Sequence, residues 1–368
     1  TFVQKLAVFI ATLCVLVVLH EYGHFIVARW NRVRVTDFAV GFGKTLFMWT
    51  SPRSGTNYRI NLWPLGGYCA MQGEDGKSLE SEQQREFLAA DPAGEDGNFQ
   101  AKPAAGRLAI VLAGPVANFI LTFAIFLFSA IAFGIPTDAE APTIGPLIPG
   151  TPAVHVGLRM GDEVVAINGV PVVSGAQLIN KIHGSLGVPL RLRYRRAGVE
   201  QEVIVKPIRS VQDGKVVGII GFRPISSLAH VGLGTAITTA GSEVASIFML
   251  NIEGLGQLVA NPVHNYSSAM SVIGMERAAS QVQDLGWAAY FSFAAAISMA
   301  LGIFNLLPIP ALDGGRAAFI VAELVRGRPV DPEKEAFVHL TGMALLMALM
   351  VFLAFHDISN IIAGKGVF

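Results

Sequence analysis

An uncharged apolar run near the start of the chain ends in two histidines and a glutamate, and this combination constrains the fold most strongly. The run extends from Leu6 to Leu19 and is followed directly by His20-Glu21-Tyr22-Gly23-His24. Apolar residues then continue to Ala28, so the segment Leu6–Ala28 has 23 residues, which is about 34 Å of helix. Because that length is enough to cross a bilayer, the sequence predicts a transmembrane helix that carries polar groups.

The spacing of the two histidines favours a metal site. In a helix, His20 and His24 lie one turn apart on the same face. Two neutral imidazoles at this spacing can share a tetrahedral Zn2+ ion, and the Glu21 carboxylate between them can activate a water molecule. Polar groups are costly inside a membrane and usually serve a function there. We therefore predict His20 and His24 as zinc ligands and Glu21 as the catalytic carboxylate.

Composition extends the membrane prediction to the whole chain. Of the 368 residues, 52% are hydrophobic and only 15% are charged, whereas soluble domains have roughly 25% charged residues. Lys plus Arg and Asp plus Glu both number 27, so there is no basic excess that would indicate nucleic acid as a partner. The two cysteines, Cys14 and Cys69, form no disulfide framework. The chain is predicted to be a polytopic membrane protein.

The order of apolar and polar segments predicts a polytopic α-helical membrane protein with four transmembrane helices. We expect these helices at residues 1–30, 107–136, 284–315 and 334–358, with a membrane-associated β-hairpin and loop at 31–106, which includes a short helix near Glu80–Ala89, and a cytoplasmic loop at 316–333. A further span through Ala236–Val259 is disfavoured by Glu243, Asn251 and Glu253. Residues 224–283 are therefore predicted to form helices that lie on the membrane surface.

Residues 142–223 have a different character, with recurring turn residues and short apolar stretches. Asn168-Gly169 is a strong signal for a tight hairpin turn. The stretch from Pro152 to Gly169 resembles the core of a PDZ domain, a small β-rich module that binds a chain terminus or extended peptide at a sheet edge. The resemblance implies one extracytoplasmic PDZ domain whose binding groove is formed by Gly218, Ile219, Ile220, Gly221 and Phe222.

The third apolar run leads to a candidate third metal ligand. This run, Leu285–Leu307, is followed by Pro308 and Pro310, which stop a helix, and then by Asp313 on irregular backbone. Arginines flank both His24 and Asp313, which marks both as near the cytoplasmic face. With four spans Asp313 returns to the side of His20, whereas a fifth span would place it about 30 Å away. The sequence thus predicts that Asp313 completes the site.

The second apolar run carries two further features. Gly114 and Pro115 would kink the helix or allow a neighbouring helix to approach closely. Asn118 is the only strongly polar side chain of this span, and it either hydrogen-bonds a neighbouring helix or helps to line the site.

Taken in order, these motifs resemble the site-2 proteases, specifically the RseP-type (regulator of sigma-E) intramembrane metalloproteases of bacteria. The matching features are the HExxH motif at His20, the Gly41-Phe42-Gly43 and Gly66-Gly67-Tyr68 turns, the Gly114–Phe119 patch, the PDZ core, and the run from Asn305 to Asp313. They cover nearly the whole chain. Some members carry two tandem PDZ domains, whereas only one is recognisable here.

The resemblance implies a function and further site residues. The family cleaves single-span proteins within the membrane, typically anti-sigma factors that another protease has first trimmed outside, and resides in the bacterial inner membrane. Asn305 would bind substrate near the scissile bond, and the hairpin with Gly41, Phe42, Gly43, Gly66, Gly67 and Tyr68 would clamp the unwound substrate strand.

Two other functions fit parts of the sequence. One is a membrane-anchored zinc protease for quality control, with its active site in the cytosol. Its helix would normally supply a Glu as the third ligand, so the dependence on Asp313 discriminates between the two proteases. The other is a non-catalytic PDZ scaffold, which the presence or absence of stoichiometric zinc would test.

Overall fold

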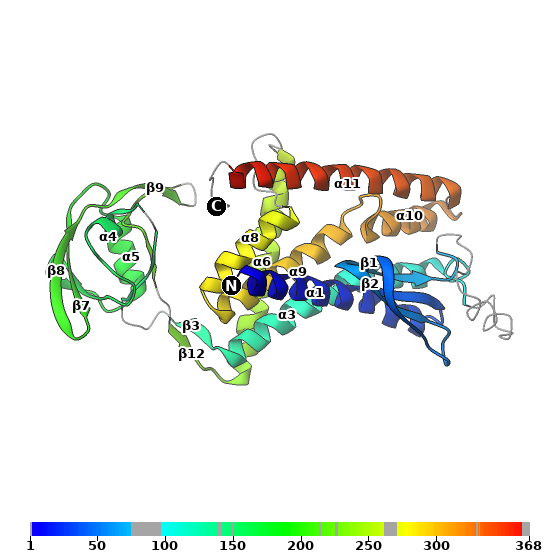
Figure 1. Cartoon of the computed structure of the whole chain (residues 1–368), viewed down its shortest axis with the longest axis horizontal. Helices are drawn as coiled ribbons and strands as arrows, with labels where there is room; N and C mark the ends of the chain where they lie inside the picture. Colours follow the sequence, from blue (N-terminus) through cyan, green and yellow to red (C-terminus); the bar gives the residue numbers. More distant parts are fainter. Residues whose placement is uncertain are drawn as a thin grey trace. The chain divides into compact units, whose positions relative to one another are not determined.

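The computed structural model describes residues 2–74, 97–137, 142–148, 150–212, 215–224, 227–260, 271–328, 330 and 332–362. The helix expected near Glu80–Ala89 lies outside these residues. The chain divides into two units (Figure 1): unit 1 comprises Thr1–Ser129 and Ile237–Phe368, and unit 2 comprises Ala130–Ala236.

Unit 1 is dominated by long apolar helices. Among the described residues, 5 helices are long and apolar enough to cross a membrane, one more than the sequence predicted. They are α1 (Phe2–Trp30), α3 (Ala104–Ala132), α6 (Leu233–Ala260), α9 (Trp287–Leu306) and α11 (Pro332–Ile362). Two shorter helices, α8 (Val272–Asp284) and α10 (Asp313–Arg326), flank α9.

The extra candidate is α6, where the sequence predicted surface helices without a long apolar element. It is one continuous helix of 28 residues. Glu243 and Glu253 do not interrupt it because both are exposed, and the Asn251 amide donates to the Ile247 carbonyl one turn earlier (2.7 Å). In Figure 1, α6 runs across the direction of α1 and α11, and it packs on α3 and α9 through Ala240. Helix α6 is long enough to cross a membrane, but it does not run parallel to α1 and α11.

Helix α10 is a second difference from the sequence-based prediction, which placed a loop at 316–333. With 14 residues this helix is too short to be recognised as a membrane span. Its buried apolar residues are Ala317 and Ile320. These two pack against the end of α1 and the start of α3. Gly327, at φ 70°, ends the helix in the left-handed conformation. This packing holds the first residue of α10, Asp313, in unit 1.

The predicted β-hairpin region forms two long, bent strands, β1 (Val35–Thr50) and β2 (Asn57–Met71). Residues Asp37–Val40 pair with both halves of β2, with Gly67–Ala70 and with Asn57–Ile60. The first half of β1 is therefore flanked on both sides. Several register shifts interrupt the ladder, and such irregularities bend a strand and increase its twist. The long strands thus fold back into a compact sheet beside α1.

Unit 2 contains short strands and two short helices around one apolar core. Its main sheet has the order β6-β5-β7-β8 and is antiparallel, and its core includes Leu178, Leu190 and Leu192. The elements are β3 (Ile135–Thr137), β4 (Ile144–Leu147), α4 (Pro152–His155), β5 (Glu163–Ile167), β6 (Val170–Pro171), α5 (Gly175–His183), β7 (Leu190–Arg196), β8 (Val199–Val205), β9 (Ile208–Gln212), β10 (Lys215–Ile219), β11 (Phe222–Pro224) and β12 (Ser227–Ala229).

The tight turn predicted in unit 2 is confirmed. Asn168 and Gly169 join β5 to β6 and both have positive φ, 51° and 80°. A two-residue hairpin turn with positive φ at both positions strongly prefers Asn-Gly.

Candidate metal centre and active site

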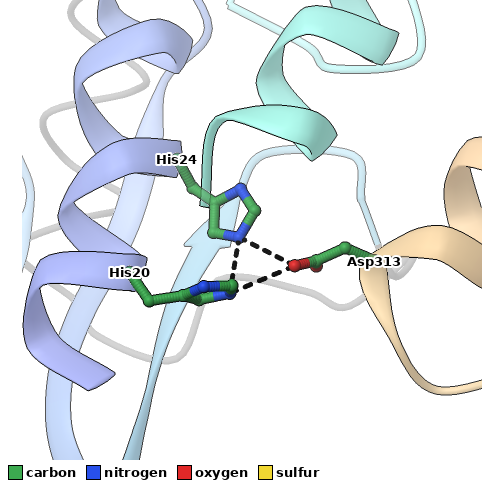
Figure 2. Close-up of side chains that lie close together, drawn as sticks. All are labelled: His20, His24 and Asp313. Carbon is green, nitrogen blue, oxygen red and sulfur yellow. Dashed lines mark hydrogen bonds and ion pairs between the residues drawn. The ribbon is translucent and has the colours of Figure 1, made fainter. Parts of the chain in front are cut away.

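Three side chains from distant parts of unit 1 converge on one point. Figure 2 shows His20 and His24 projecting from α1 toward Asp313 of α10. The His20 Nε2 and His24 Nε2 atoms lie 3.1 and 3.3 Å from Asp313 Oδ2, and 3.2 Å from each other. One potential ligand atom from each residue lies within 4.8 Å of the other two. The group is therefore close enough for all three side chains to bind one ion.

Local structure places each of these side chains. His20 and His24 occupy successive turns of α1 and are 7% and 6% exposed. Asp313 follows an irregular segment, Leu307–Leu312, that redirects the chain after α9. A Cβ on Gly314 or Gly315 would collide with the carbonyls of Leu307 and Ile309. Two adjacent glycines thus allow α10 to begin tightly against this segment, with Asp313 as its first residue.

The donor atoms suit a metal cation. His24 Nδ1 lies 2.8 Å from the Ile110 carbonyl of α3. Because an Nδ1–H that donates there leaves the Nε2 lone pair free, His24 Nε2 faces the centre as an electron-pair donor. Asp313 Oδ2 is buried and faces the two Nε2 atoms. Two imidazole nitrogens and one carboxylate, converging in a buried space, form a donor set that zinc uses in catalytic sites.

Glu21 lies between α1 and the bent sheet. Its side chain passes close to Gly67 of β2. A Cβ built on Gly67 would lie 3.5 Å from Glu21 Cγ and 2.8 Å from the Ala39 carbonyl. The absence of a side chain at Gly67 therefore lets β2 pass directly beside Glu21.

The other predicted hairpin residues form one cluster on this sheet. The Phe42 ring covers Gly66 so closely that a Cβ there would collide with it, and it stacks on Tyr68 at 6.3 Å between ring centroids. Gly41 and Gly43 both have positive φ, 83° and 84°, which glycine adopts without strain. Asn305 lies in the last turn of α9 with a half-buried side chain.

In unit 2, the predicted groove residues run from the end of β10 to the start of β11. Gly218 abuts α5, since a Cβ there would lie 2.8 Å from the Ile182 carbonyl. Ile220 is buried in the core, and Gly221 packs on Thr151. Phe222 begins β11, which within the described residues pairs on one side only, with β4. Ile219 is the last residue of β10.

His339 of α11 contacts the segment that precedes Asp313. The Ala311 backbone N–H donates to His339 Nδ1 (2.9 Å), and Gly342 of the same helix leaves no room for a Cβ against Pro310. Helix α11 thus contacts the segment that carries Asp313. An imidazole one turn before a glycine was the only signal in the sequence.

Comparison with known proteins identifies the family. Residues 8–349 match peptidase family M50. The zinc metalloprotease RasP of Geobacillus kaustophilus is 31% identical, with 97% of this chain and 98% of that protein aligned. A putative zinc metalloprotease of Rhizobium meliloti is 32% identical, with 95% of each chain aligned. A solved PDZ domain of an SdrC-like protein from Listeria monocytogenes aligns with 24% of this chain and 90% of its own length, at 22% identity and a TM-score of 0.21.

The chain belongs to peptidase family M50, the site-2 proteases. Within that family it is of the RseP type, as its similarity to the RasP proteins over nearly its whole length shows. It is a metalloendopeptidase by family and, with its apolar helices, an integral membrane protein.

Proposed function

We propose that this chain is an intramembrane zinc protease that hydrolyses peptide bonds within the transmembrane segments of single-span proteins. The observation that carries the proposal is the convergence of His20, His24 and Asp313 among apolar helices, with their donor atoms within 4.8 Å. A buried metal-binding group in such surroundings is suited to a substrate that arrives through the lipid rather than through water.

In this proposal His20, His24 and Asp313 hold Zn2+. When bound, zinc acts as a Lewis acid that polarises a peptide carbonyl and makes water nucleophilic near neutral pH. The zinc metalloprotease names of relatives about 30% identical to this chain support the choice of metal. The buried Asp313 Oδ2, which faces both histidine Nε2 atoms, supports it from the structure.

Glu21 is the proposed general base and acid. It follows His20 directly, so its carboxylate lies beside the histidine pair without belonging to it. It would take a proton from the attacking water and deliver that proton to the leaving amide nitrogen.

The substrate is proposed to bind as an extended strand beside the sheet. A helical substrate must unwind before cleavage, because its backbone groups are bonded to one another. The cluster of Gly41, Phe42, Gly43, Gly66, Gly67 and Tyr68 would receive the unwound strand, with β2 already adjacent to Glu21. Asn305 would contact the same strand near the scissile bond.

We place the chain in the bacterial inner membrane as a four-span protein, with the active site near the cytoplasmic face and α6 on the opposite membrane surface. Unit 2 would be an extracytoplasmic PDZ domain that binds a peptide or chain terminus at the free edge of β11, along Gly218–Phe222. The proposed substrate class is an anti-sigma factor that another protease has already trimmed outside.

The central test is Glu21→Gln in proteoliposomes that contain a single-span reporter substrate. We expect no cleavage, with zinc content and folding equal to those of the parent protein, because the amide cannot accept the proton. The matched control is Glu253→Gln on α6, which changes an exposed carboxylate and should leave cleavage unchanged.

Mass spectrometry of the fragments locates the cut. A cleavage site within the apolar segment supports intramembrane proteolysis, whereas a site in the flanking polar sequence would favour the protease with a cytosolic active site. Continued cleavage by the Glu21→Gln variant would remove Glu21 from the mechanism.

A further inference from the structure

One face of α3 contacts both imidazoles of the proposed metal site. Ile110, Gly114 and Asn118 are spaced by four residues, so they lie on one face of this helix. The Ile110 carbonyl lies 2.8 Å from His24 Nδ1, and the Asn118 amide Nδ2 lies 3.1 Å from His20 Nδ1. Gly114 lies between them and faces the two Nε2 atoms. None of these three residues belongs to the group that would bind the ion.

Gly114 faces the place where an ion would bind. A Cβ built on this residue would lie 2.7 Å from His20 Nε2, 2.6 Å from His24 Cε1 and still closer to His24 Nε2. Zinc bonds to histidine nitrogen at about 2.0–2.1 Å. A methyl group on Gly114 would therefore compete with the ion for the space in front of both nitrogens. The missing side chain keeps that space open.

Asn118 faces the other end of the His20 ring. Its side chain is fully buried, its Nδ2 is directed at His20 Nδ1, and its Oδ1 has no hydrogen-bond partner among the described residues. Metal binding at His20 Nε2 requires the proton to be on Nδ1, and an N–H cannot donate to an amide NH2. A half-turn of the carboxamide would place the unpartnered Oδ1 against Nδ1–H.

We propose that Gly114 and Asn118 are positioning residues of the metal site. Gly114 keeps the ion's space open, and the Asn118 carboxamide accepts the Nδ1–H of His20, which fixes the ring with Nε2 toward the ion. Partners of this kind usually change metal affinity by about 10–100-fold. The inference rests on the proposed zinc site, and zinc content is measured in its test independently of cleavage.

The first experiment is Gly114→Ala in the full chain, with zinc per protein measured after equilibration against a chelator. We expect zinc to fall below about a tenth of the parent content. Unfolding of the metal-free protein is measured beside it, because the new Cβ meets the two buried rings and should lower stability even without an ion. The control, Gly106→Ala on the same helix, meets only the Asn31 side chain and should retain zinc.

The second experiment compares two changes at Asn118. Asn118→Leu removes the acceptor at similar size and should weaken zinc binding about 10–100-fold. Asn118→Asp restores an acceptor for Nδ1–H and should bind zinc at least as tightly as the parent. Thr122→Val is the control, because Thr122 is also fully buried and bonds only to the carbonyls of Asn118 and Ala295. Cobalt substitution gives an absorption spectrum that reports ligand geometry for each variant.

The outcomes separate the two proposals. A parent protein without zinc would overturn the metal site itself. A parent with zinc and a Gly114→Ala variant with equal zinc affinity would overturn the role of Gly114 alone. If Asn118→Asp loses zinc together with Asn118→Leu, the hydrogen bond to His20 is not what Asn118 contributes. The Asn118 series decides the question if Gly114→Ala does not fold.

Discussion

Unit 1 and unit 2 distribute apolar and polar side chains in opposite ways. In β7 of unit 2, Leu190, Leu192 and Tyr194 are buried while Arg191 and Arg193 are exposed, the alternation of a sheet with one face in water. In unit 1, Leu345 and Phe355 of α11 are exposed, whereas the interior holds His20, His24 and Asn118. The same chain thus contains one unit patterned for water and one patterned for lipid.

Because of this contrast, substitutions in the two units should affect different properties. Unit 2 buries mainly apolar residues, so its substitutions should change folding of that unit and leave the metal site intact. Unit 1 buries the polar group on which the proposed chemistry depends, so substitutions there should change zinc content first.

The largest expected effect is from Asp313→Asn. Removal of the single anionic donor should abolish zinc retention and reporter cleavage, because two neutral imidazoles then face an amide. Metal analysis and the cleavage assay measure this. Asp284→Asn changes an exposed carboxylate that is paired with Lys5. This variant should retain zinc and cleave the reporter. Full cleavage by the Asp313 variant would show that the site has been assigned to the wrong residues.

Leu192→Ala tests the other side of the comparison. Leu192 is fully buried in the core of unit 2, and loss of such a side chain costs about 2–5 kcal/mol. Hydrogen exchange of β5 and β7 should accelerate accordingly, with zinc content unchanged. Ile204→Ala on the exposed side of β8 is the control. Loss of zinc from the Leu192 variant would mean that the two units are energetically coupled.

A smaller effect is expected from Asp162 in unit 2. Its carboxylate accepts hydrogen bonds from Arg196 (2.6 and 2.7 Å) and from the Arg159 backbone N–H (2.7 Å). Burial would raise the pKa of Asp162, but these partners lower it overall. The resulting stabilisation is therefore complete above the unfolded pKa of about 3.9 and is lost as pH falls through the lower folded pKa.

Asp162→Asn should accordingly destabilise unit 2 by about 1–3 kcal/mol near neutral pH and reduce the acid dependence of its stability. Hydrogen exchange of β5 as a function of pH measures both. Glu200→Gln, on an exposed strand, provides the comparison. An unchanged pH profile in the Asp162 variant would assign the acid sensitivity to another carboxylate.

The smallest effect should come from the Arg191–Glu202 pair on the surface of unit 2. The two groups are 3.0 Å apart, but their side chains are 64% and 48% exposed. Exposed pairs contribute about 0–1 kcal/mol. A double-mutant cycle with alanine at both positions should give a coupling energy in that range, and a clearly larger coupling would contradict the treatment of this face as fully solvated.

The sequence correctly predicted features that depend on a few neighbouring residues. The four-residue spacing placed His20 and His24 on one face of α1, and Asn168-Gly169 specified the turn between β5 and β6. It did not reveal α10, because a helix of 14 residues is too short to be recognised as a membrane span. It also discounted α6, because Glu243 and Glu253 argue against a long apolar helix. In the structure both side chains are exposed, and the helix continues past them.

The sequence by itself determined the family, four of the 5 long apolar helices and the residue types of the proposed site, because these depend on composition and on spacing within single elements. The count of spans predicted Asp313 as a partner of the two imidazoles, but only the tertiary structure showed how it reaches them and which other groups surround them. Asp313 arrives through the packing of α10 on α1 and α3, and Gly114 and Asn118 acquire their partners because α3 passes directly beside α1. Contacts between segments far apart in the chain depend on packing, which periodicity within one segment does not specify.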